Sequence, residues 1–146
     1  MNRYEAKVSW EGSTGLGWDH YDRTHLATAP PAEHELTLTT GESKGDPRHL
    51  NPEQLVVMAA SSCQMLWFLH LAAKARIDVT SYEDSAEGEM PEGRLTKIVL
   101  RPRIVVAPGP AEERVKHLAE LAHHECNIAN SLNSEVLVVP EVVFAG

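Results

Sequence analysis

The chain contains two cysteines, Cys63 and Cys126, whose spacing raises the clearest chemical possibility in the sequence. Two thiols that meet in space can form a redox couple, because one is oxidised and the other then closes a disulfide. Two thiols that stay apart are small buried hydrophobic side chains, since free cysteine is among the most buried residue types. A chain of 146 residues does not need a disulfide framework for its stability. The pair therefore indicates either thiol chemistry or ordinary core packing.

A reactive cysteine needs positive charge nearby, because the thiolate is the reactive form. Cys63 lies about three turns after the predicted start of its helix, so the helix dipole gives it little help. Arg23 is the strongest candidate for the missing charge and Arg48 the second, since arginine stays protonated and donates through a planar fork. Glu53 is the natural partner of such an arginine, because a carboxylate can hold a guanidinium in place. These residues are the candidate site.

A long helix is predicted to carry Cys63. Asn51 is a good N-cap, Pro52 suits the first helical position, and Glu53 places negative charge at the positive end of the helix dipole. The helix should run to about Ala75, with apolar residues on almost every face. We therefore expect it to be buried nearly all round, enclosed by sheets or by a second subunit.

The other segments alternate between strand and helix patterns. Residues 18–25 are predicted to form a loop or an irregular edge strand, and 35–40 a strand that pairs with the first one. Pro102 indicates an edge position or a bulge. Helical segments are expected over residues 111–125 and 127–132, and strands over 4–10, 35–40, 79–90, 94–106 and 135–144. This order predicts a single α+β domain over residues 1–146.

The separation of Glu53 and Cys63 limits how they can act together. Ten residues of one helix span roughly 15 Å at 1.5 Å per residue, so the two side chains cannot share a compact site within one chain. If both serve the same chemistry, a second chain must bring its Glu53 to Cys63. The apolar helix independently favours such a partner, and both arguments predict a dimer with a shared site.

Three segments resemble the OsmC/Ohr family of organic hydroperoxide reductases. The run from Asn51 to Leu55 with Cys63 after it is similar to the family's first cysteine motif, and the sequence from His124 to Leu132 is similar to the second. The segment Tyr21–His25 resembles the family's loop arginine. The resemblance extends over essentially the whole chain, although Asn127 stands where a proline most often follows the second cysteine. The subfamily, OsmC or Ohr, stays open.

The resemblance implies a fold, a reaction and a set of roles. The fold would be an intertwined homodimer with antiparallel sheets wrapped around long buried central helices. Cys63 would attack the O–O bond of an alkyl or lipid hydroperoxide, and Cys126 would resolve the sulfenic acid to an intramolecular disulfide. Arg23 would polarise the peroxide, and Glu53 would hold Arg23 in place. An external dithiol, such as a lipoyl group, would restore the thiols without any bound cofactor.

Composition and charge argue against several other partners. The net charge of −8 and the lack of a basic stripe argue against nucleic acid. The N-terminus lacks the apolar core of a signal peptide, and no uninterrupted apolar run reaches membrane length, so we expect a cytoplasmic protein without a membrane partner. No glycine-rich phosphate loop is present, which argues against direct use of NAD(P)H.

Three alternatives stay open from the residues alone. His117, His123 and His124 lie near Cys126, yet no second pair of ligands at zinc-site spacing accompanies them, so we expect no metal. A Cys–His hydrolase would use His123 or His124 as the base, and nothing in the sequence places an oxyanion hole. The third alternative is a non-enzymatic dimeric module that binds a small apolar ligand.

Overall fold

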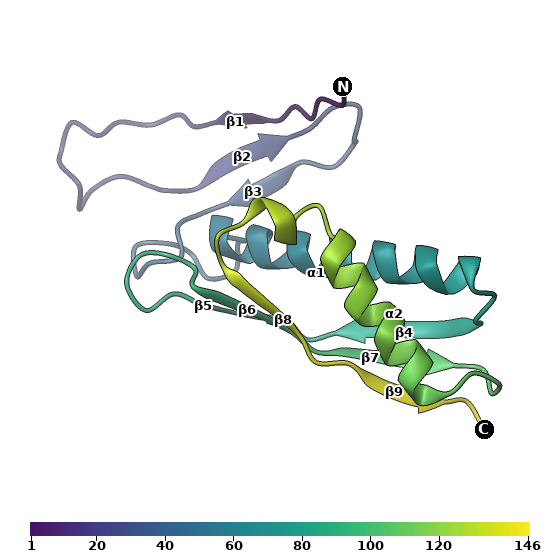
Figure 1. Cartoon of the computed structure of the whole chain (residues 1–146). Coiled ribbons are helices and arrows are strands. Elements are labelled where there is room, and N and C mark those ends of the chain that lie inside the picture. The colour runs from purple at the N-terminus through teal and green to yellow at the C-terminus, as the bar shows by residue number, and fades with distance from the viewer. The chain divides into compact units, whose positions relative to one another are not determined.

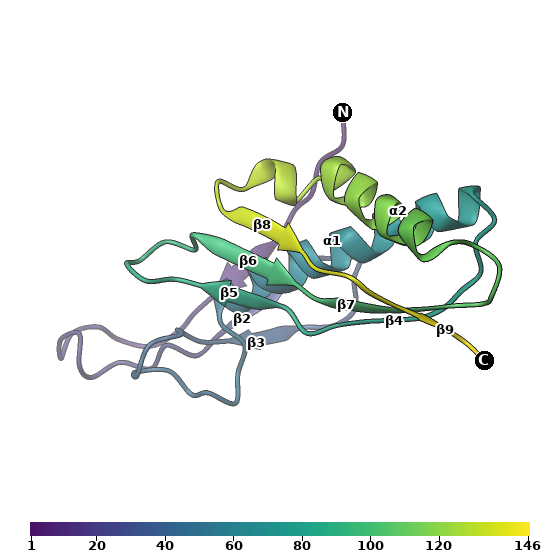
Figure 2. The same ribbon diagram turned by 60° about the horizontal axis from the view of Figure 1, so that its bottom comes forward.

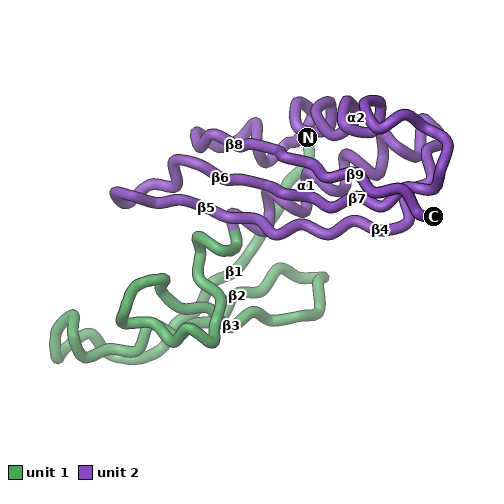
Figure 3. Tube along the Cα trace, turned by 90° about the horizontal axis from the view of Figure 1, so that it is seen from below, with its two compact units in different colours: residues 1–55 green, residues 56–146 purple.

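The computed structural model describes residues 1–146, which divide into two compact units, residues 1–55 and residues 56–146 (Figure 3). The boundary falls within the first turns of the long helix α1 (Pro52–Lys74). The single domain expected over residues 1–146 stays a prediction.

Unit 1 is built on a three-stranded antiparallel sheet in the order β1-β2-β3. Its strands are β1 (Lys7–Ser9), β2 (His25–Thr28) and β3 (Leu36–Leu38). Val8 lies opposite Ala27, and Leu26 lies opposite Thr37. The predicted pairing of the strand over 35–40 with the first strand is therefore wrong. The reason is that β2 lies between these two strands, and the sequence predicts no strand over residues 26–28.

Reciprocal hydrogen bonds fix the start of α1 at Asn51, the residue that the sequence predicts as the N-cap. The Asn51 side chain accepts a hydrogen bond from the Gln54 backbone N–H at 2.9 Å, and the Gln54 side chain accepts one from the Asn51 N–H at 3.0 Å. This capping box satisfies two backbone donors at the helix start. Pro52 is the first helical residue and Glu53 lies in the first turn.

The burial of α1 is one-sided in the isolated chain. Its buried residues recur every four positions and are Ala60, Gln64, Phe68 and Ala72. Met58 and Leu66 lie on the opposite side and are 47% and 60% exposed. Only one side of the helix packs within unit 2, so the chain's own sheets do not enclose α1, and its burial by a second subunit stays a prediction. By length and composition α1 could also cross a membrane, a property shared by core helices of soluble proteins.

Unit 2 contains two mixed three-stranded sheets, in the orders β4-β7-β9 and β5-β6-β8. Their strands are β4 (Val79–Asp84), β5 (Glu87–Glu89), β6 (Lys97–Leu100), β7 (Pro102–Val106), β8 (Glu135–Val138) and β9 (Glu141–Phe144). The pairs β4–β7 and β5–β6 are antiparallel as expected, whereas β6–β8 and β7–β9 are parallel. The parallel pairs arise because α2 (Glu112–Glu125) connects β7 to β8 as a crossover (Figures 1 and 2).

Pro102 lies in a central strand, so the expected edge position is wrong, and the register shift of the β4–β7 pair lies between Val79 and Ser81 rather than at Pro102. β7 lies between β4 and β9, and Pro102 is its buried first residue. The first position of a strand tolerates proline, which has no N–H to donate. At the break between β6 and β7, the Arg101 N–H donates to the Asp84 carboxylate at 2.6 Å instead of to a strand.

Both helices of unit 2 contribute to one hydrophobic core. Phe68 of α1 and Ile104 of β7 are completely buried, as is Val115 of α2. A second cluster joins Ala60 of α1 to Ile98 on the neighbouring sheet. The expected short helical turn is the 3-10 helix η1 (Ala129–Ser131), which follows α2. The core therefore holds the middle of α1 and the end of α2 in fixed positions.

Candidate functional site

Cys63 lies in the middle of α1 and is half-buried. Its neighbour Gln64 is 1% exposed and donates through Nε2 to the Ala119 carbonyl of α2 at 2.9 Å. The Gln64 Oε1 atom is buried without a hydrogen-bond partner. Gln64 thus ties the helix turn that carries Cys63 to α2.

Cys126 is the C-cap residue of α2 and is 1% exposed. Its backbone N–H donates to the His123 carbonyl at 3.3 Å, which closes the last turn of the helix. The Cys126 sulfur accepts a hydrogen bond from the Ala129 N–H at 3.4 Å. The end of α2 and the turn into η1 therefore enclose the thiol.

The structure brings the two thiols together from positions 63 residues apart in the chain. Burial raises the pKa of the Cys126 thiol above its ordinary value of 9.0, and the neighbouring Cys63 thiol raises it further. The Ala129 N–H opposes this rise in the pKa of Cys126. Both cysteines are free thiols. A neighbouring dithiol of this kind can carry a thiol–disulfide cycle.

A pocket of about 380 Å³ lies within unit 1, and Arg23 and Glu53 both line it. The other lining residues are Trp10, Thr14, Tyr21, His25, Thr39, Thr40 and Pro52. Its volume is within the range of small-molecule sites. The pocket places an arginine and a carboxylate from the predicted set beside the same space.

Arg23 is held by its own loop rather than by Glu53. Its guanidinium donates to the Tyr21 carbonyl at 2.7 Å and to the Trp18 carbonyl. The guanidinium carbon also lies 3.7 Å from the centre of the Tyr21 ring, a cation–π contact. The ion pair expected between Arg23 and Glu53 is not formed in this conformation.

Glu53 has an unused acceptor in the pocket. Its Oε2 atom is buried and has no hydrogen-bond partner. A buried carboxylate oxygen without a donor is costly, since charged groups lose more on desolvation than neutral ones. The site therefore lacks a donor for Glu53, and a guanidinium or a substrate hydroxyl would supply one.

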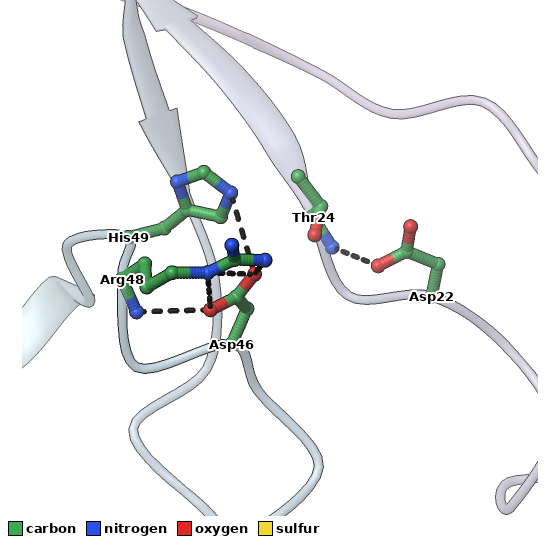
Figure 4. Close-up of polar contacts among 5 residues, drawn as sticks. All are labelled: Asp22, Thr24, Asp46, Arg48 and His49. Atoms are coloured by element: carbon green, nitrogen blue, oxygen red, sulfur yellow. Dashed lines mark hydrogen bonds and ion pairs between the residues drawn. The ribbon is translucent and has the colours of Figure 1, made fainter.

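Arg48, the second candidate arginine, is engaged elsewhere. It forms a two-point contact with the Asp46 carboxylate (Figure 4). Its side chain is 86% exposed. These hydrogen bonds lower the pKa of Asp46 to about 2. Arg48 does not line the pocket that contains Arg23 and Glu53. Of the two arginines, Arg23 is the one that lines the same pocket as Glu53.

Tryptophan side chains lie in both parts of the predicted set, and of these the sequence did not single out Trp10. Trp10 packs edge-on against Tyr21, with ring centres 6.0 Å apart, and both line the pocket of unit 1. Trp67 donates through Nε1 to the Asn127 side chain at 3.1 Å. The helix spacing of Cys63 and Trp67 places them one turn apart, which is the one signal in the sequence that could have linked them.

The histidines near Cys126 do not form a metal centre. No group of three or more His, Cys, Asp or Glu side chains lies close enough together to hold a metal ion. His123 and His124 have ring centres 5.6 Å apart, and the His123 Nδ1 atom is buried without a partner. Burial and the neighbouring His124 lower the pKa of His123, although Glu120 opposes them.

Comparison with known proteins identifies the class of this α+β fold. The OsmC-like protein family model matches residues 43–141. The structure of the OsmC-like protein of unknown function VCA0330 from Vibrio cholerae is 31% identical, with a TM-score of 0.82 and coverage of 98% of this chain and 100% of that one. This chain belongs to the OsmC-like family. A comparison with curated proteins gives no match.

More distant structures share the fold. An organic hydroperoxide resistance protein OsmC from Legionella pneumophila is 20% identical, with a TM-score of 0.66 and coverage of 97% of each chain. The organic hydroperoxide resistance protein OhrB of Bacillus subtilis is 19% identical, with a TM-score of 0.59 and coverage of 96% of this chain and 98% of that one. The resemblance to OsmC/Ohr proteins in the sequence is thereby confirmed at the level of family and fold.

Proposed function

We propose that this protein is a thiol-dependent peroxidase that reduces organic hydroperoxides to alcohols. The observation that carries the proposal is the neighbouring pair of free thiols, Cys63 and Cys126. Cys63 is the half-buried member and receives the peroxide, and the enclosed Cys126 reacts second. Family membership and the organic hydroperoxide resistance proteins among its structural neighbours support this assignment.

The reaction balances with one hydroperoxide and one dithiol. The Cys63 thiolate attacks the outer peroxide oxygen, the O–O bond breaks, and the alkoxide takes up a proton to leave as the alcohol. Cys63 is then a sulfenic acid. Cys126 attacks its sulfur, hydroxide leaves as water, and the disulfide forms. An external dithiol of the lipoyl type reduces the disulfide, so the protein needs no bound cofactor.

Arg23 and Glu53 would bind and polarise the peroxide in this proposal. The Arg23 guanidinium has donors for the peroxide oxygens, and the free Glu53 oxygen can hold the guanidinium once it leaves the Tyr21 ring. Because about 15 Å of helix separates Glu53 from Cys63, we propose that the pocket of one chain serves the thiols of a second.

A homodimer is the partner that α1 requires in this proposal. Met58 and Leu66 on its uncovered side are large apolar side chains that a second copy would bury. We expect a dimer at nanomolar concentration by mass photometry, and a monomer or insoluble protein for Leu66→Glu. A wild-type monomer at micromolar concentration would refute the shared site.

We propose a cytoplasmic location, where reducing conditions maintain the free thiols.

The proposal is tested by counting thiols. Reduced protein receives one equivalent of cumene hydroperoxide, and free thiols and intact mass are then measured. Loss of both thiols with a mass decrease of about 2 Da is expected, because one disulfide replaces two S–H groups. Cys63→Ser should consume no peroxide. Cys126→Ser should stop at the Cys63 sulfenic acid with one equivalent of peroxide and reach the sulfinic acid only when further equivalents are added. Turnover by the Cys63→Ser variant would refute the assignment.

The pocket of unit 1 favours a second candidate, a non-enzymatic dimeric module that binds a small apolar ligand. Trp10, Tyr21 and Pro52 give the pocket apolar walls. This candidate predicts that both thiols survive the peroxide. The same thiol count therefore separates the two functions.

A further inference from the structure

Two side chains that flank the thiol pair are joined by a hydrogen bond. Trp67 lies one helical turn after Cys63, and Asn127 directly follows Cys126. The Trp67 Nε1–H donates to the Asn127 Oδ1 atom at 3.1 Å. This bond fastens α1 to the turn that carries Cys126, across 60 residues of sequence.

Several hydrogen bonds within the turn after Cys126 link Asn127 to the Cys126 sulfur. The Asn130 N–H donates to the Cys126 carbonyl at 3.0 Å, and the Ser131 hydroxyl donates to the Asn127 carbonyl at 2.7 Å. The Ala129 N–H donates to the Cys126 sulfur itself. A displacement of Asn127 therefore moves the sulfur with it, because these bonds close small rings around residues 126–131.

We infer that the Trp67–Asn127 hydrogen bond positions Cys126 for its attack on oxidised Cys63. Trp67 and Asn127 are thus positioning residues of the disulfide-forming step, and this inference rests on the proposed peroxidase function. In that step the Cys126 sulfur bonds to the Cys63 sulfur, the S–O bond of the sulfenic acid breaks, and the oxygen leaves as water. Disulfide geometry tolerates little error, since the two Cβ atoms must approach to about 3.5–4.5 Å.

The expected slowing of disulfide formation depends on the other contacts that hold the turn after Cys126. Ile128 and Leu132 also pack against the core of unit 2, so loss of the Trp67 bond should loosen the turn rather than release it. One neutral hydrogen bond changes a rate by roughly 2- to 10-fold when its whole contribution is lost. A slower second step leaves the sulfenic acid exposed for longer, which favours its overoxidation to the sulfinic acid.

The test follows the two steps separately in Trp67→Phe, Asn127→Ala and the double variant. Reduced protein is mixed with cumene hydroperoxide, peroxide loss is recorded, and samples are quenched with dimedone for mass spectrometry. We expect unchanged peroxide loss, disulfide formation slowed by roughly 2- to 10-fold in each single variant, and no further slowing in the double variant. Sulfinic Cys63 should accumulate in all three. Ser134→Ala, which removes a hydrogen bond to Leu95 remote from the cysteines, is the control and should match the wild type.

Four results would overturn the inference. Disulfide formation at the wild-type rate in both single variants would show that the bond does not position Cys126. Multiplicative slowing in the double variant would show that the two residues do not act through one bond, and equal slowing of both steps would show a general structural role. Survival of both thiols in the wild-type protein would overturn the proposed function as well, whereas the first three outcomes leave that function intact.

Discussion

The rate of disulfide formation should rise steeply with pH, because the resolving thiol is the buried one. Cys126 is 1% exposed, and its burial raises its pKa above the ordinary 9.0. Only the thiolate attacks a sulfenic acid, and below the pKa the thiolate fraction increases tenfold for each pH unit. Between pH 6 and pH 8 the resolving step should therefore accelerate by about 100-fold. Changing only the pH is thus a strong perturbation of the second step.

The assay is a single turnover with cumene hydroperoxide in the presence of dimedone, which traps the sulfenic acid that has not yet been resolved. The dimedone adduct should dominate near pH 6 and the disulfide near pH 8. Cys126→Ser should give only the adduct or the overoxidised product at every pH. A disulfide rate that stays constant from pH 6 to pH 8 would refute the reasoning, because it would mean that the thiolate is already formed or is not required.

Three other predictions concern stability and titration. Gln64→Leu should leave the free energy of unfolding unchanged or raise it by up to ~2 kcal/mol. The lost hydrogen bond to Ala119 contributes about 1 kcal/mol, whereas the unpaired buried oxygen that the variant removes costs about 1–3 kcal/mol. A decrease of more than ~1 kcal/mol in urea unfolding would show that Oε1 has a partner. Phe68→Ala should lower the free energy of unfolding by about 3–5 kcal/mol, since the ring is completely buried, and a loss below ~1 kcal/mol would contradict the core described for unit 2. The pKa of Asp46 is about 2 in the folded chain and 3.8 ordinarily, so its contribution to stability is present above pH 4 and is lost as the pH falls toward 2. Arg48→Ala should return that pKa toward 3.8 in a carboxyl NMR titration, and an unchanged value would show that Arg48 is not the cause.

Local patterns in the sequence predicted the elements that short-range chemistry determines. Asn51 and Pro52 mark the start of α1, and both hydrogen bonds of the capping box are present. The amphipathic helix expected over residues 111–125 is α2, and the short turn after it is η1. These features depend on neighbours three or four residues apart, which the sequence displays directly.

Strand partners and burial depend on distant residues, so local patterns did not determine them. β2 displaced the expected pairing of the first strand with the strand over 35–40, because its four residues are too few to show a clear alternation. Pro102 indicated an edge or a bulge, yet Asp84 accepts the free Arg101 N–H and lets the proline begin a central strand. The all-apolar pattern of α1 did not distinguish burial by the chain's own sheets from burial by a second chain.

For the candidate site as well, the sequence indicated which residue types are present but not which contacts they make. The sequence offered Cys63 and Cys126 as a possible pair, and only the family resemblance favoured their meeting. The structure places the two thiols together because Ala60 and Phe68 pack α1 into the same unit as the end of α2. Arg23 could be listed as a candidate charge, whereas its stacking on Tyr21 depends on the shape of a loop without periodicity. A residue type indicates which chemistry is possible, and long-range packing decides which partner it receives.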